Sequence, residues 1–217
     1  MTLTTTTQQT AAPLSLTLGT TPEGAPVTWQ LLDEHGQTEH GIITGPRGCG
    51  GTTALRRLAT QARAAEIHTV QIDLDGGPAW GPEAAAHHIN TSAQLETELG
   101  DALTQDYDTD APVLLLVDGH QALNVQREAW ERLLIASRAL GVAVVARLHS
   151  LAQIHCGGSL VRSLLLGSGQ YAALGAGLDL AAPTTLPGYQ EPTGTWQETG
   201  TGLYGHRGQT TPLTVTA

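Results

Sequence analysis

The chain has 217 residues and a formal net charge of −10 at pH 7, a length that fits one α/β domain with small appendages. The acidic balance argues against a broad basic surface that grips nucleic acid without specificity. The two cysteines, Cys49 and Cys156, have no CxxC spacing, so the sequence predicts neither a disulfide framework nor a structural zinc site.

Targeting and membrane signals are absent from the sequence as it stands. The first residues, MTLTTTTQQTAAP, lack the basic region and apolar run of a signal peptide. No apolar run approaches the roughly 20 residues that cross a bilayer. We therefore expect a cytoplasmic protein without a transmembrane segment. The chain contains no lysine and no phenylalanine and is rich in Ala, Gly, Thr and Leu, which indicates a GC-rich genome such as that of an actinobacterium.

The predicted elements alternate along the chain. Residues 1–13, rich in Thr and Gln, predict a disordered tail, and two alternating runs around TPEG in residues 14–32 predict a β-hairpin. The next elements, in chain order, are a strand at 40–45, a helix at 52–65, a strand at 68–75, a helix at 91–105, a strand at 111–119, a helix at 124–141, a strand at 142–148, a short helix at 157–167 and a strand at 170–176.

Residues 182–217 are rich in Gly, Pro and Thr and predict an irregular closing segment with short extended pieces. The order of elements predicts a single α/β domain over residues 14–217. Its expected form is a mainly parallel sheet with helices on both faces and an N-terminal β-hairpin.

The segment GIITGPRGCGGTTALRRL, residues 41–58, has the form of a phosphate-binding loop between a buried strand and a helix. Such a loop needs glycines that turn backbone N–H groups inward, a helix N-terminus, and a Lys and a Ser or Thr at its end. Against the pattern GxxxxGK[ST], only the lysine position departs, because Gly51 stands there. The aligned positions, of which all except Gly51 fit the pattern, are Gly45, Pro46, Arg47, Gly48, Cys49, Gly50, Gly51 and Thr52.

An acidic residue at the end of a second buried strand completes the pattern of a P-loop NTPase. VLLLVDG places Asp118 at that position. Thr52 and Asp118 are therefore the expected Mg²⁺ ligands, and the loop residues together with Thr53 and Asp118 are the expected nucleotide contacts. A tight glycine turn without any ligand is the alternative interpretation of the loop.

The order and spacing of segments from about Leu14 to about Thr214 resemble the motor domain of the FtsK/SpoIIIE/HerA group of DNA-pumping ATPases, which have a RecA-like P-loop fold. The similar segments are the hairpin before the loop, His40 ahead of the first core strand, VQIDLDGG, VLLLVDG, LGVAVVARLHSL and LPGYQEPTGTWQETGTGLYGHRGQ. Similar sequences occur in actinobacterial plasmid-transfer proteins of the TraB type. The resemblance implies ATP with Mg²⁺ as ligand and assembly into hexameric rings.

Two departures from that family concern the chemistry. Gly51 replaces the loop lysine, and Gly119, followed by His120, replaces the glutamate after the strand aspartate. The family's polar glutamine falls near Leu148, beside Arg147 and His149. The double loss predicts no independent hydrolysis, and no catalytic residue is assigned.

Three functions stay open at this stage. The first is a pseudo-ATPase that binds ATP and Mg²⁺ weakly or not at all and acts as a regulatory or structural subunit in DNA transfer or translocation. Its partners would be copies of itself or an intact FtsK-like ATPase, with DNA contacted indirectly at most. The second is a slow ATPase completed by Arg47 or by another subunit. The third is a protein-binding module that holds a peptide in the old nucleotide pocket.

Overall fold

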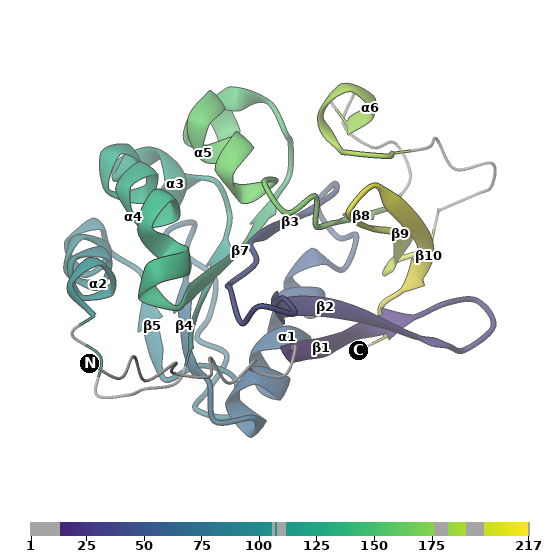
Figure 1. Ribbon diagram of the computed structural model, residues 1–217, viewed down its shortest axis with the longest axis horizontal. Coiled ribbons are helices and arrows are strands. Elements are labelled where there is room, and N and C mark those ends of the chain that lie inside the picture. The colour runs from purple at the N-terminus through teal and green to yellow at the C-terminus, as the bar shows by residue number, and fades with distance from the viewer. Residues whose placement is uncertain (1–13, 106, 108–111, 176–181, 190–197, 217) are drawn as a thin grey trace, which may run out of the picture.

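The computed structural model describes residues 14–105, 107, 112–175, 182–189 and 198–216 (Figure 1). The predicted tail 1–13 lies outside the described residues. The strands are β1 (Leu14–Thr20), β2 (Pro26–Leu32), β3 (Gly41–Thr44), β4 (His68–Ile72), β5 (His87–Ile89), β6 (Val113–Asp118), β7 (Val142–Leu148), β8 (Tyr171–Leu174), β9 (Thr201–His206) and β10 (Gln209–Thr214). The helices are α1 (Gly51–Ala64), α2 (Ser92–Thr104), α3 (Gln121–Val125), α4 (Arg127–Leu140), α5 (Ser159–Leu165) and α6 (Ala182–Thr185), with a 3-10 turn, η1, at Gln153–His155.

The strands of the described residues form one ten-stranded sheet in the order β2-β1-β10-β9-β8-β3-β7-β6-β4-β5. Strands β8, β3, β7, β6, β4 and β5 pair in parallel, and β9, β10, β1 and β2 continue the sheet with antiparallel pairing. The predicted α/β fold, with its parallel core and N-terminal hairpin, is confirmed. Because β3, β6 and β7 are parallel neighbours, their carboxyl ends meet at one edge.

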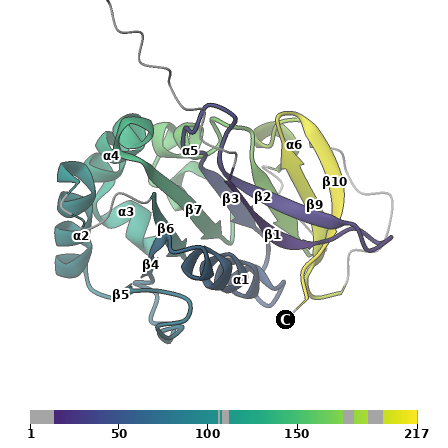
Figure 2. The ribbon, with the colours of Figure 1, turned by 60° about the horizontal axis from the view of Figure 1, so that its bottom comes forward.

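Helices cover both faces of the parallel core. Helix α1 lies on one face, and α2, α4 and α5 lie on the other (Figure 2). The α1 side buries Leu55 and Leu58 against the sheet together with Trp29 of the hairpin, and the opposite side buries Trp130 and Leu133 of α4. The hairpin and α1 thus share a core, which fixes the helix behind β3. Among the described helices, none combines the length and apolar character of a membrane span.

The helix ends agree with the sequence signals. The Thr91 hydroxyl accepts a hydrogen bond from the Gln94 N–H at the start of α2. Gly141 ends α4 in the left-handed conformation, which glycine adopts without steric strain because it has no Cβ.

Two parts of the fold differ from expectation. The closing segment 182–217 was predicted to be irregular with short extended pieces; within its described residues these pieces form the regular hairpin β9–β10, paired from Gln209 with His206 to Thr214 with Thr201. Threonines and glycines hide this alternation because neither is a strongly apolar residue. Strand β5 was not predicted, since it is three residues long and begins with His87 and His88.

Candidate functional site

The glycine loop begins where β3 ends, at the centre of the sheet. Gly45, Gly48 and Gly50 all have positive φ angles of 154°, 81° and 96°, a region that other residues enter only with strain. A Cβ at Gly45 would overlap the carbonyl oxygen of Leu174 on the neighbouring strand β8. Glycine at this position therefore allows the close approach of two backbones.

The loop presents the start of α1 without a side-chain cap. Gly50 is the N-cap residue and has no side chain that could accept the first N–H groups of the helix. Pro46, Arg47 and Gly48 are exposed, whereas Cys49 is buried. Burial raises the pKa of the Cys49 thiol, which favours a space-filling role over a reactive thiolate.

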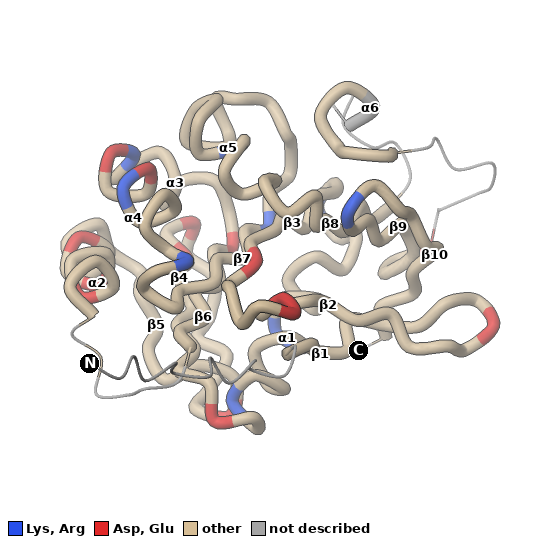
Figure 3. The backbone as a smooth tube through the Cα atoms, in the orientation of Figure 1, with Lys and Arg blue, Asp and Glu red and all other residues tan. Residues whose placement is uncertain are grey.

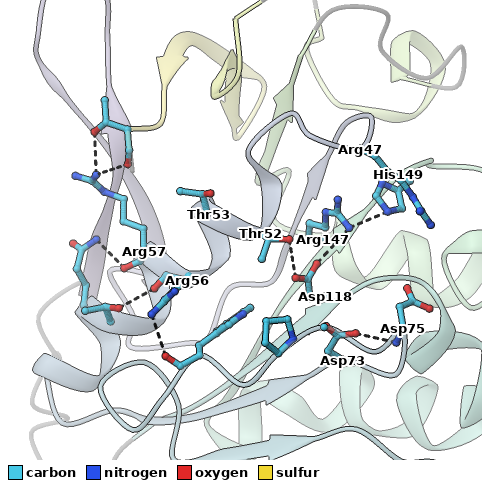
Figure 4. A pocket seen from close by; sticks show the side chains of 16 residues that line it. Arg47, Thr52, Thr53, Arg56, Arg57, Asp73, Asp75, Asp118, Arg147 and His149 are labelled. Carbon is cyan, nitrogen blue, oxygen red and sulfur yellow. Dashed lines mark hydrogen bonds and ion pairs between the residues drawn. The ribbon is translucent and has the colours of Figure 1, made fainter.

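Thr52 and Asp118 lie together as the sequence predicts. The Thr52 hydroxyl donates a hydrogen bond of 2.8 Å to Asp118 Oδ2. Thr53 is exposed and lies away from the Asp118 carboxylate (Figure 4). The pair Thr52–Asp118 offers a hydroxyl and a carboxylate at one point, which is the hard oxygen chemistry that Mg²⁺ prefers.

Asp118 is buried among other charges. Burial raises its pKa, while the Thr52 hydrogen bond and the Arg147 charge oppose that rise. The carboxylates of Asp73 and Asp75, which follow β4, raise the pKa of Asp118 further. A cation near Asp118 would therefore be stabilised by three carboxylates at this edge of the sheet.

Arg147 of β7 is the site residue that motif reading does not assign. It pairs in register with Ile43 of β3 and with Asp118 of β6. Its Nη1 lies 3.4 Å from Asp118 Oδ1 and 3.0 Å from His149 Nε2. The Arg147 side chain is only 12% exposed. The one available signal was an arginine inside the apolar run VAVVARL.

Arg147 also fills the space beside Gly51, the position at which the pattern has a lysine. A Cβ built on Gly51 would lie 3.0 Å from both Cγ and Nε of Arg147, which is tighter than an ordinary contact. The stem of Arg147 thus passes directly over Gly51, and a larger residue there would require the stem to shift by a few tenths of an ångström.

A second close approach involves Gly119, the position of the family's glutamate. Gly119 has a φ angle of 109°, and a Cβ there would overlap the Asp75 carboxylate. The next residue, His120, lies with its Nδ1 3.9 Å from Asp75 Oδ2. A carboxylate therefore lies against Gly119, although it comes from the loop that follows β4.

Several buried polar atoms around the loop have no hydrogen-bond partner. They are Thr44 Oγ1, Asp118 Oδ1, Arg147 Nε and His149 Nδ1. Buried polar atoms are normally paired, so a cluster of unpaired ones is a feature of sites that take a ligand. Donors and acceptors are both present, which fits a phosphate group together with a cation.

The site opens into a pocket of about 930 Å³ that runs along α1 (Figure 4). Arg47, Asp75 and His149 line its loop end. At the other end Arg56 donates to the Trp80 carbonyl oxygen over 3.2 Å, and Arg57 donates to the Thr17 carbonyl oxygen over 3.2 Å. These two arginines are therefore engaged by the protein, whereas Arg147 forms an ion pair with Asp118.

The fold and the loop define a P-loop NTPase domain. A family model described as an AAA domain matches residues 34–165, more than half of the chain. This chain belongs to the AAA domain family. No curated protein matches the chain.

Solved structures share the fold at low sequence identity. The cytoplasmic domain of the Thermomonospora curvata type VII secretion ATPase EccC superposes with a TM-score of 0.65 and 16% identity, over 95% of this chain and 26% of that one. EccC ATPases 2 and 3 from the same organism, in complex with a signal sequence peptide, give 0.65 and 15% over 96% of this chain and 41% of that one. The pCW3 conjugation coupling protein TcpA with ATPγS gives 0.69 and 12% over 94% and 65%. The chain thus spans a quarter to two thirds of these structures' lengths.

Proposed function

We propose that this domain binds a nucleoside triphosphate at the glycine loop and serves as a regulatory or structural subunit of an FtsK/HerA-like machine for DNA transfer or translocation. The observation that carries the proposal is the cluster of unpaired buried polar atoms on Thr44, Asp118, Arg147 and His149 beside an uncapped helix start. The structural likeness to TcpA, which was solved with ATPγS, supports a nucleotide as the ligand.

Mg²⁺ would be held by Thr52 and Asp118, whose oxygens already lie together. When bound, Mg²⁺ supplies positive charge to the phosphates. The chain's own groups orient the ligand: the loop glycines present N–H groups, and Arg147 presents a guanidinium at the end of β7.

Independent hydrolysis is not part of the proposal. Water activation in this family is expected from a glutamate after the strand aspartate, and Gly119 provides no side chain there. The test is a titration of Mg·ATP followed by a hydrolysis assay at high enzyme concentration. Saturable binding without turnover supports the proposal, and turnover that Asp118→Asn abolishes would overturn it.

A slow ATPase is the second candidate, and the position of Asp75 favours it. Its carboxylate lies against Gly119, where it could accept a proton from an attacking water. If turnover is found, Asp75→Asn is expected to remove it while ATP binding persists. The matched control is Glu83→Gln, a surface carboxylate that pairs with Arg56 at 3.3 Å and lies outside the phosphate end of the site.

The acidic surface of the domain favours protein partners over DNA. Acidic residues lie on α2, on α4 and at the tip of the β1–β2 hairpin (Figure 3), and the net charge is −10. We propose copies of the chain or an intact homologue as partners in the cytoplasm, with DNA contacted indirectly. If ATP does not bind, a peptide-binding pocket becomes the better interpretation, because EccC was solved with a signal sequence peptide.

A further inference from the structure

Position 51 of the glycine loop carries no cation, and the proposal for its replacement rests on the proposed binding of a nucleoside triphosphate. We propose that Arg147 replaces the loop lysine: the phosphate-binding cation has moved from position 51 on the loop to the carboxyl end of β7. The ligand class is the terminal phosphates of a nucleoside triphosphate, or inorganic polyphosphate of the same charge.

The geometry places the Arg147 side chain beside position 51, where the pattern has its lysine. The Arg147 stem lies over Gly51, with Cγ and Nε both 3.0 Å from where a Cβ would be. The two side chains compete for space, since a Cβ at position 51 would require the Arg147 stem to shift by a few tenths of an ångström. Glycine at position 51 is therefore the residue that admits Arg147, rather than merely a lost lysine.

The partners of Arg147 leave donors for a ligand. A guanidinium has five N–H groups. Nη1 faces His149 Nε2 at 3.0 Å and Asp118 Oδ1 at 3.4 Å, while Nε is buried and has no partner. Burial and the neighbouring Arg147 lower the pKa of His149, so His149 is neutral near pH 7 and accepts from the guanidinium without repelling it. The remaining donors can meet a phosphate in the forked geometry that arginine provides.

Arg47 is the other arginine at the loop, and its environment is different. It is exposed on the loop itself, where water screens its charge. Arg147 is 12% exposed and held by two partners. A held, desolvated cation binds phosphate more strongly than a solvated one because less side-chain freedom is lost on binding.

The test is a comparison of ATP affinities by isothermal titration calorimetry with Mg²⁺ present. Arg147→Gln is expected to weaken ATP binding about 10- to 100-fold, the range for loss of a charge-assisted hydrogen bond. Arg147→Ala should weaken it at least as much. Arg132→Ala, which removes an exposed arginine on α4, is the matched control and should leave the affinity unchanged.

The decisive variant returns the cation to the loop. In the Arg147→Ala background the space over Gly51 is open, so adding Gly51→Lys should recover most of the lost affinity. Gly51→Lys alone should not improve binding, because the new side chain meets the Arg147 stem. Melting temperatures of all variants identify any that fail to fold, and Arg147→Gln preserves most of the side-chain volume if Arg147→Ala does not fold.

Each outcome separates this inference from the proposed function. Unchanged or tighter ATP binding by Arg147→Gln would show that Arg147 is not the phosphate cation, and a double variant that folds without regaining affinity would contradict the exchange of positions. Both results leave nucleotide binding itself standing. Absence of ATP and tripolyphosphate binding by the wild-type protein would overturn the proposed function and this inference together.

Discussion

The two ends of the neighbouring strands β3 and β7 carry polar clusters of opposite character. At the amino end, His40 accepts from the Val144 N–H over 3.0 Å through Nδ1 and lies 2.7 Å from Ser137 Oγ through Nε2. Ser137 Oγ in turn donates to the Leu134 carbonyl oxygen over 2.9 Å. This series of hydrogen bonds assigns the Nε2–H tautomer to His40, and each polar side-chain atom of His40 and Ser137 has a partner.

At the carboxyl end, Thr44, Asp118, Arg147 and His149 each retain a buried polar atom without a hydrogen bond, and that of Asp118 lies in an ion pair with Arg147. The same strands therefore end in a completed network on one side and an incomplete network on the other. A completed buried network stabilises and orients elements, whereas an incomplete one carries a free-energy penalty that a ligand can remove. The difference is consistent with a scaffold role for the His40 network and a ligand-binding role for the carboxyl end.

The largest expected effect comes from the backbone at the carboxyl end. Gly45→Ala should reduce the free energy of unfolding by roughly 2–5 kcal/mol, because a Cβ overlaps Leu174 and the φ angle is strained. Urea denaturation measures the loss. Gly48→Ala is the control, since it has a positive φ but open space, and should cost only about 1 kcal/mol. Equal losses would mean that close packing at Gly45 is unimportant.

Breaking the completed network should come next in size. His40→Ala removes the acceptor of the buried Val144 N–H and leaves a cavity, so it should lower stability by about 3 kcal/mol. ATP affinity of the folded variant should not change, in contrast to the Arg147 variants. His35→Ala, in an exposed turn, should alter stability by less than about 0.5 kcal/mol. A loss of ATP affinity in His40→Ala would remove the distinction between the two clusters.

The same histidine should make stability depend on pH. Burial, with the nearby Arg138 charge, lowers the pKa of His40 to about 4, whereas the unfolded chain titrates near 6.5. The unfolded state thus binds more protons between these values, and His40 should reduce stability by about 2 kcal/mol as pH falls from 7 to 5. Subtracting the profile of His40→Asn isolates this contribution. Identical profiles for the two proteins would contradict it.

The smallest expected effect is a gain. Thr44 buries a hydroxyl without a partner at the carboxyl end, and Thr44→Val replaces it with a methyl group of similar shape. Stability should rise by about 1 kcal/mol, because an unsatisfied polar group leaves the interior. Thermal unfolding measures the gain. A clear destabilisation would show that the hydroxyl belongs to the scaffold.

Much of the fold could be read from the sequence because its signals are local. Apolar runs predicted the buried strands, and Thr91 and Gly141 marked helix ends that the structure has. The regular hairpin β9–β10 was understated because its strands are rich in Thr and Gly. Strand β5 is stabilised by pairing with β4 rather than by its own residues.

The meeting of Thr52 and Asp118 could also be predicted, since parallel strands end at one edge. The positions of Arg147 and Asp75 could not. A motif compares residues position by position, so the glycines at 51 and 119 indicate only that the lysine and the glutamate of the family are missing. Which side chain enters the vacated space depends on strand register and side-chain direction, as the contacts of Arg147 over Gly51 and Asp75 against Gly119 show.

The most direct test of the central claim is a crystal structure of the protein with Mg²⁺ and ATPγS. The account expects the terminal phosphates at the glycine loop, with the Arg147 guanidinium contacting a phosphate oxygen and Mg²⁺ near Thr52 and Asp118. Phosphates bound in the loop while Arg147 stays only on Asp118 and His149, or a nucleotide bound elsewhere, would contradict it.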